Sequence, residues 1–362
     1  MVCIAAFIIL CLISVVVAFL SIFKRDIGAK WWKVFKKAWH CVFKKVRLQK
    51  CDTNFKDDVK NSILRKVIVK KPKWVKPLSI LIEVISVLIV IITVWSIVIA
   101  IKSLLALWVF GTCNVSQPSQ CSLGAEVCSI DADEPTTLWG KIGRGIGEWG
   151  QIFGAIPDRL KDWKVEDISV YPAFVASDTG KELALSVIDP GCSVCMQSYK
   201  NLQADSEFLA NHTLYVAIYP IELPDGGYKF KNSGIITRYI YATVIYQQEQ
   251  LAKDKSATAA EVYRYSQSII ARIFTESNKK GINYQSVFNN ELDSDQAVEL
   301  LESWLTEWGA SVDDVARIRE LTDSEQVANA IKQTKDAVDS QIHAKGIPVM
   351  IYDGRKHDGL YK

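Results

Sequence analysis

The stretch IDPGCSVCMQSYKNL, residues 188–202, carries two cysteines three positions apart, Cys192 and Cys195. The apolar run LALSVID, residues 183–189, leads into this stretch and predicts a buried strand that a Pro-Gly turn closes. The residues after Cys192 favour a helix. We therefore expect the CxxC pair to lie where a strand ends and a helix begins.

That position has chemical consequences for the two thiols. Unpaired N–H groups and the helix dipole stabilise an anion at a helix N-terminus, which lowers a thiol pKa from its usual value of about 8.5. We predict that Cys192 is the attacking thiolate. Cys195, about one helical turn further on, is predicted to resolve mixed disulfides and to form a redox-active disulfide with Cys192.

A CxxC pair can also be half of a zinc site or a fixed structural disulfide. Zinc needs further ligands, yet no second CxxC or nearby pair of histidines follows, and His212, His343 and His357 occur singly. We predict no metal and no organic cofactor. The structural disulfide stays open as an alternative.

A second segment, SEQVANAIKQTKDAVDSQIHAKGIPVMIYDG, residues 324–354, favours a helix followed by a strand over residues 347–352. With the CxxC segment, it resembles the DsbA-like thioredoxin superfamily. Members of that family carry a strand, CxxC, a helix, a helical insertion and then a strand with a Gly-x-Pro motif. The resemblance covers residues 165–362 and implies an α/β thioredoxin-like fold with a large helical insertion at about residues 225–345.

The resemblance also implies roles for residues outside the CxxC pair. Pro348 is expected to be cis and to lie near Cys192. The backbone of Ile347 is expected to pair with an extended substrate, so that these two residues position substrate.

The chain departs from the family in several places. Ser193 and Val194 separate the cysteines, so the redox direction stays open. Ser186 stands where many relatives have a buried acid, and the nearest carboxylate, Asp189, either assists proton transfer or is only a turn residue. Eight residues follow Gly354, which predicts a shortened sheet.

Two apolar stretches near the N-terminus predict a membrane protein. Residues 1–23 and 77–110 are each long enough to span a bilayer as a helix. Residues 24–76 between them carry eighteen Lys and Arg against four Asp, a net charge of +14, which places this loop in the cytoplasm. The loop contains an amphipathic pattern suited to membrane lipid. A two-pass topology follows, with the catalytic domain outside the cytoplasm.

Residues 111–164 are expected to form an extracytoplasmic linker that contains Cys113, Cys121 and Cys128. Two of these three can form a disulfide and leave one over, and their spacing does not select the pair. The later part of this linker, from Trp139 to Phe153, has apolar residues at helical spacing and predicts a membrane-proximal amphipathic segment.

These features predict a membrane-anchored thiol-disulfide oxidoreductase of the cell envelope, acting as a dithiol oxidase. Its expected partners are thiols and disulfides of secreted or envelope proteins and a membrane redox partner. A membrane-linked reductase or isomerase, and a non-catalytic thioredoxin-fold scaffold, are the alternatives. The net charge of +3 hides a basic loop and an acidic remainder, so nucleic-acid binding is not predicted.

Overall fold

The computed structural model describes residues 74–362, apart from 122, 124, 133–134, 172–173, 176–181, 224 and 254–258, together with Trp32, Lys36 and Trp39. The predicted membrane span over residues 1–23 and nearly all of the basic loop over 24–76 lie outside the described residues. The chain divides into two compact units, Met1–Ile101 and Lys102–Lys362. Every residue predicted to take part in catalysis or to position substrate belongs to the second unit.

The first element of the described chain is helix α4, Val75–Phe110. Within the described residues, one helix is long and apolar enough to cross a membrane, and it covers Lys76–Phe110. The last turns of α4 belong to the second unit, because Ala106, Val109 and Phe110 are buried against Ile152 and Ala155.

A five-stranded sheet forms the centre of the second unit, with the strand order β2-β4-β3-β6-β7. Strand β3 pairs with β4 in parallel and with β6 antiparallel. The last five residues of β3 are all buried, as expected for a central strand covered on both faces. The strands are β2 Phe174–Val175, β3 Glu182–Ile188, β4 His212–Ile218, β6 Val349–Tyr352 and β7 Arg355–Asp358.

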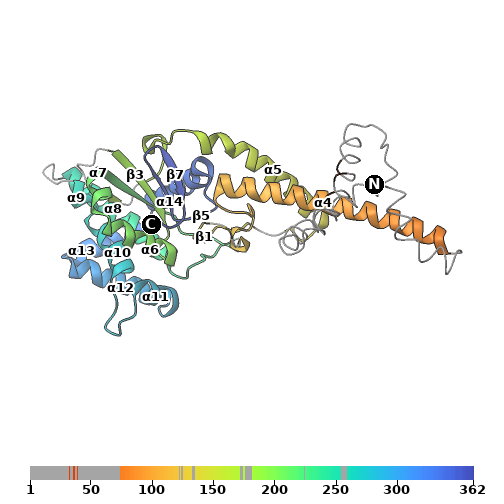
Figure 1. Ribbon diagram of the computed structural model, residues 1–362. Helices are drawn as coiled ribbons and strands as arrows, with labels where there is room; N and C mark the ends of the chain where they lie inside the picture. The colour runs from red at the N-terminus through yellow and green to blue at the C-terminus, as the bar shows by residue number, and fades with distance from the viewer. Residues whose placement is uncertain are drawn as a thin grey trace. The chain divides into compact units, whose positions relative to one another are not determined.

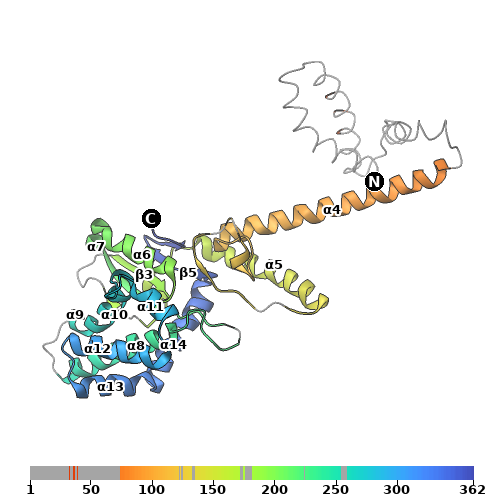
Figure 2. The same ribbon diagram turned by 90° about the horizontal axis from the view of Figure 1, so that it is seen from below.

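Helices flank the sheet, and most of them come from one insertion between β4 and β6 (Figures 1 and 2). Helix α8 is its centre, since α8 packs against α10, α12, α13 and α14. The helices before the insertion are α6 Ser193–Ala204 and α7 Ser206–Asn211. Those inside it are α8 Ser233–Lys253, α9 Ala259–Val262, α10 Arg264–Thr275, α11 Tyr284–Asn290, α12 Ser294–Glu307, α13 Val312–Thr322 and α14 Glu325–Ala337.

This architecture is a mixed α/β thioredoxin-like fold with a large helical insertion. The two strands predicted over residues 183–189 and 347–352 are present as β3 and β6. The expected shortening of the sheet was wrong, because Arg355–Asp358 turns back and pairs with β6 as β7. Asp353 and Gly354 both adopt positive φ, which allows this tight turn so close to the end of the chain.

The segment between α4 and the sheet is also folded. Helix α5, Leu138–Leu160, begins at Thr137, whose side chain accepts the N–H of Gly140. Ahead of α5, the two-residue strand β1, Cys128–Ser129, pairs with β5, Gly346–Ile347. A segment predicted as a linker therefore reaches the strand that precedes Pro348.

Candidate active site: a buried cluster of three cysteines

Cys192 caps the N-terminus of α6, as the sequence predicted. Its backbone carbonyl accepts the N–H of Met196 at 3.0 Å, and its Sγ accepts the N–H of Cys195 at 3.3 Å. Helix α6 starts here because a turn connects it to the end of β3. In this turn the Cys192 N–H donates to the carbonyl of Asp189 at 3.1 Å. The sulfur therefore lies at the start of the helix and accepts the Cys195 N–H, which stabilises a thiolate once Cys192 is reduced.

The pairing of the cysteines differs from the expectation. Cys192 is bonded to Cys128, with the two Cα atoms 6.2 Å apart, whereas Cys195 is a free, buried thiol. The expected Cys192–Cys195 disulfide is thus absent from this state, because the pairing of β1 with β5 brings Cys128 within bonding range. Of the three linker cysteines, Cys113 and Cys121 form a second disulfide and Cys128 is the one left over.

Ile347 and Pro348 lie beside this disulfide. The Ile347–Pro348 peptide bond is cis, as the family resemblance implied. The Cys192 Sγ lies 3.9 Å from the carbonyl oxygen of Ile347, so the expected proximity is also present. Their role in positioning substrate remains a prediction.

Asp189 is fully buried at the end of β3. Its carboxylate accepts N–H groups from Gly191 at 2.7 Å and Ile221 at 2.8 Å, and the hydroxyl of Ser233. Burial raises the pKa of Asp189 to about 6, although these hydrogen bonds oppose the rise. A carboxyl group with this pKa can take up and release a proton near neutral pH.

The Cys195 thiol lies within electrostatic reach of that carboxylate. Burial raises the pKa of Cys195 well above its ordinary value, and the charge on Asp189 raises it further. Cys195 therefore stays protonated at neutral pH unless a base accepts its proton. Ser186, which stands where the family resemblance implies an acid, is a buried residue of β3.

Helix α11 supports the CxxC turn, and sequence reasoning missed this contribution. The buried amide of Gln285 donates to the carbonyls of Pro190 at 3.0 Å and Cys192 at 2.9 Å. Asn289, one turn later, donates to the carbonyl of Gly191 at 2.8 Å. Because both come from an insertion far along the chain, spacing within the CxxC segment carried no sign of them.

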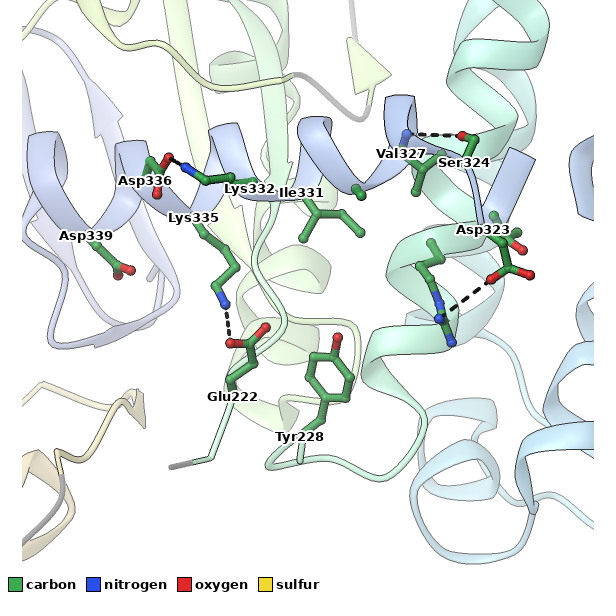
Figure 3. A pocket seen from close by; sticks show the side chains of 13 residues that line it. Glu222, Tyr228, Asp323, Ser324, Val327, Ile331, Lys332, Lys335, Asp336 and Asp339 are labelled. Atoms are coloured by element: carbon green, nitrogen blue, oxygen red, sulfur yellow. Dashed lines mark hydrogen bonds and ion pairs between the residues drawn. The ribbon is translucent and has the colours of Figure 1, made fainter. Parts of the chain in front are cut away.

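The cluster is closed to solvent in this state. Cys192 and Cys195 are 0% exposed and Cys128 is 9% exposed. A cavity of about 600 Å³ lies elsewhere, between α14 and the segment that carries Glu222 and Tyr228. In Figure 3, Lys335 reaches from α14 to Glu222 across this cavity, and among the described residues its lining holds no cysteine.

A second group of polar side chains lies at the opposite end of β3 from the cysteines. The ligand atoms of Glu182, His212 and Asp353 lie within 4.8 Å of one another. Both ring nitrogens of His212 already have partners, the Phe208 carbonyl and the Asp353 carboxylate, each at 3.0 Å. These contacts account for the buried histidine without an ion.

Comparison with known proteins gives distant structural likenesses. No family model matches the chain, and no curated protein matches it. Similar solved structures include a thioredoxin-like oxidoreductase from Silicibacter pomeroyi DSS-3, with 12% identity, a TM-score of 0.35, and coverage of 52% of this chain and 84% of that one. The thiol-disulfide exchange protein alpha-DsbA2 from Wolbachia pipientis shows 12% identity, a TM-score of 0.32, and coverage of 55% and 83%.

A third likeness is to MdbA, a thiol-disulfide oxidoreductase from Corynebacterium matruchotii, with 17% identity, a TM-score of 0.34, and coverage of 50% of this chain and 80% of that one. The chain is thus structurally similar to DsbA-like thiol-disulfide oxidoreductases. At these identities the likeness identifies no substrate or activity. The assignment of the fold rests on the strand order, the CxxC at the start of α6 and the position of Pro348.

Proposed function

We propose that this chain is a thiol-disulfide oxidoreductase that exchanges disulfides with extracytoplasmic proteins through Cys192 and Cys195, in the direction of a dithiol oxidase. The observation that carries the proposal is the state of the cluster. Cys192 forms a disulfide with Cys128, which lies outside the CxxC motif, and Cys195 is a free thiol one helical turn away. This is the arrangement of a mixed disulfide before its resolution.

The surroundings suit each step of such an exchange. The N–H of Cys195, which points at the Cys192 sulfur at 3.3 Å, stabilises a thiolate when Cys192 leaves or attacks. Asp189, ionised above a pKa of about 6, accepts the proton of Cys195 as that thiol becomes a nucleophile. Gln285 and Asn289 hold the turn in place during the change of partner.

A second candidate function is favoured by the burial of the cluster. With Cys192 0% exposed, the Cys128–Cys192 bond also suits a fixed structural disulfide in a non-catalytic binding scaffold. The two candidates differ in a measurable property, because a structural disulfide stays unreactive towards small thiols as long as the chain is folded.

The proposal places the second unit outside the cytoplasm, anchored to the membrane by α4 and by the apolar stretch over residues 1–23. Three observations support this placement: the apolar composition of α4, the net charge of +14 over residues 24–76, and a pair of disulfides in the second unit. Disulfides persist in oxidising compartments and are rare in the cytosol. A membrane redox partner would then restore the oxidised state.

The test is turnover of a reduced, unfolded secretory protein by the detergent-solubilised chain. Cys192→Ser should abolish disulfide formation. Cys195→Ser combined with Cys128→Ser should accumulate mixed disulfides with the substrate, because no neighbouring thiol is left to resolve them. Ser193→Ala, which changes neither sulfur, serves as the matched control within the motif. Equal activity in the two cysteine variants would refute the proposal.

A further inference from the structure

The residues around Cys128 lie along the site as an extended peptide. Strand β1 runs antiparallel to β5, with Cys128 opposite Ile347 and Ser129 opposite Gly346. The pairing continues beyond the strand, since the N–H of Ile130 donates to the carbonyl of Lys345 at 3.0 Å. Figure 1 shows β1 next to β5. Strand β5 ends at Ile347, directly before Pro348.

The contact surface fits this peptide closely at Gly346. A Cβ added there would lie 2.6 Å from a Val127 methyl carbon and 3.1 Å from the Cys128 carbonyl oxygen. Cβ atoms in proteins do not come within 2.6 Å of a non-bonded carbon. Residue 346 must therefore be glycine for β1 to pair with β5 at this distance.

Lys229 holds the peptide from another side. Its ammonium donates to the carbonyl of Ser129 at 2.8 Å and to the hydroxyl of the same residue at 3.0 Å. The residues that flank Cys128 are therefore held by backbone pairing with β5, by close packing against Gly346 and by hydrogen bonds from Lys229. These are the features by which an enzyme would bind an extended, cysteine-bearing chain.

We propose that residues 127–130 act as an internal substrate peptide and that Cys128 is a third exchanging cysteine, which closes the site until a substrate displaces it. The proposal rests on the proposed function, because it requires Cys192 to exchange disulfides. It also names the substrate class: an extended segment with a cysteine that pairs antiparallel with Gly346–Ile347 and offers a carbonyl to Lys229 at the next residue.

The exchange that opens the site balances within the chain. Cys195 gives its proton to the Asp189 carboxylate and attacks the Cys192 sulfur. The Cys128–Cys192 bond breaks, a Cys192–Cys195 bond forms, and the electron pair leaves on Cys128, which takes up the proton that Asp189 received from Cys195. One disulfide and one thiol are present before and after, so no external oxidant or reductant is needed.

An internal peptide has a strong advantage over a free one. Because β1 pairs with β5 and so holds Cys128 beside Cys192, its effective concentration is at least on the order of millimolar, the value for a short flexible linker. Free substrate at about 0.1 mM would therefore compete about tenfold less well with Cys128 present than without it. The internal peptide should lower the rate for external thiols and leave the chemistry at Cys192 unchanged.

The first experiment maps disulfides in the full-length chain in detergent, by acid quenching, alkylation and non-reducing peptide analysis during equilibration with glutathione. We expect both Cys128–Cys192 and Cys192–Cys195 species, with Cys195→Ser retaining only the first. Gly346→Ala should raise the share of Cys192–Cys195 because the added methyl displaces Val127. Gly143→Ala is the control, since a Cβ at Gly143 meets nothing within 4 Å.

The second experiment measures recognition in the Cys128→Ser/Cys195→Ser variant, whose Cys192 is free to capture a peptide. The probe is the disulfide-linked dimer of EVCSID, the sequence of residues 126–131, and the control is the dimer of the reversed peptide DISCVE. We expect about tenfold faster capture of EVCSID. Lys229→Met, added to that variant, should reduce this preference.

The outcomes separate the two proposals. A Cys128–Cys192 bond that never exchanges in the folded chain, or equal capture of both peptides, would overturn the internal-substrate proposal. If the Cys128→Ser variant still oxidises thiols in that case, the proposed function stands. If Cys192 captures neither peptide and Cys128→Ser oxidises no substrate, the proposed function fails as well.

Discussion

Gln285 and Cys192 are joined by a hydrogen bond of 2.9 Å from the side-chain amide to the backbone carbonyl. Gln285 belongs to α11, in the helical insertion, whereas Cys192 caps α6 next to the sheet. The same amide also bonds the Pro190 carbonyl at 3.0 Å. The insertion therefore fixes the turn that carries the CxxC pair.

Replacing Gln285 with alanine should lower both stability and exchange rate. Two buried carbonyls would lose their donor, which costs about 1 to 3 kcal/mol in the free energy of unfolding. Urea unfolding of the detergent-solubilised chain measures this loss. Asn290→Ala is the matched control on the same helix, because that side chain is exposed and bonds only Ser286 among the described contacts. A loss no greater than that of the control would contradict the structural role of Gln285.

Asp189 should make the chain less stable as the pH rises through its folded pKa of about 6. Between the ordinary pKa of 3.8 and this value, the native state holds the proton more tightly than the unfolded chain. The contribution of Asp189 to the free energy of unfolding is therefore fully present below about pH 4 and is lost as the pH rises above about 6. The total loss is on the order of 3 kcal/mol.

Asp189→Asn should flatten this pH dependence of the unfolding free energy between pH 4 and 7. Asp205→Asn provides a control of opposite sign, because hydrogen bonds from the Phe208 N–H and Tyr361 hold the pKa of Asp205 below its usual value. The stability that Asp205 contributes is present above the unfolded pKa and is lost as the pH falls. An unchanged profile in Asp189→Asn would show that the carboxyl is not the titrating group.

Glu148 should be important for the attachment of α4 to α5. Its carboxylate accepts hydrogen bonds from Lys102, in α4, and from Ser116, and it is only 7% exposed. Glu148→Ala would leave Lys102 without its acidic partner and should lower the free energy of unfolding by about 2 kcal/mol. The loss is smaller than for a fully buried pair because Lys102 is partly exposed to solvent. Thermal unfolding in detergent measures the effect.

The exposed pair of Lys332 and Asp336 offers the comparison for Glu148. Asp336→Ala should change the stability by no more than about 0.5 kcal/mol. Equal effects of the two substitutions would show that the contact between α4 and α5 does not depend on the buried ion pair.

Much of the site was predictable because it depends on local sequence. An apolar run, a Pro-Gly turn and a helix start place Cys192 and Cys195 without any long-range information, and the structure has this arrangement. The resemblance to a known family added the cis bond at Pro348 and its place beside Cys192. Asp189 was predicted either to assist proton transfer or to be a turn residue, and the hydrogen bonds that surround its buried carboxylate are visible only in the structure.

The partner of Cys192 was not predictable for a physical reason. Cys128 lies 64 residues before Cys192 in the sequence, and the strand that brings it there is two residues long. So short a strand has no periodicity to detect. Gln285 was missed in the same way, because a polar residue on a helix is ordinarily solvated, and only packing of α11 against the turn makes it a donor to buried carbonyls.

The most direct test of the account is the redox equilibrium of Cys192 in the folded, full-length chain, measured by equilibration against glutathione buffers, thiol trapping and mass spectrometry. We predict that Cys192 and Cys195 equilibrate while the chain stays folded, with a potential above about −200 mV if the chain is a dithiol oxidase. A value near about −270 mV would assign the reducing direction instead. If the thiols equilibrate only after the chain unfolds, Cys192 does not exchange disulfides in the folded chain. The Cys128–Cys192 bond would then be a structural disulfide.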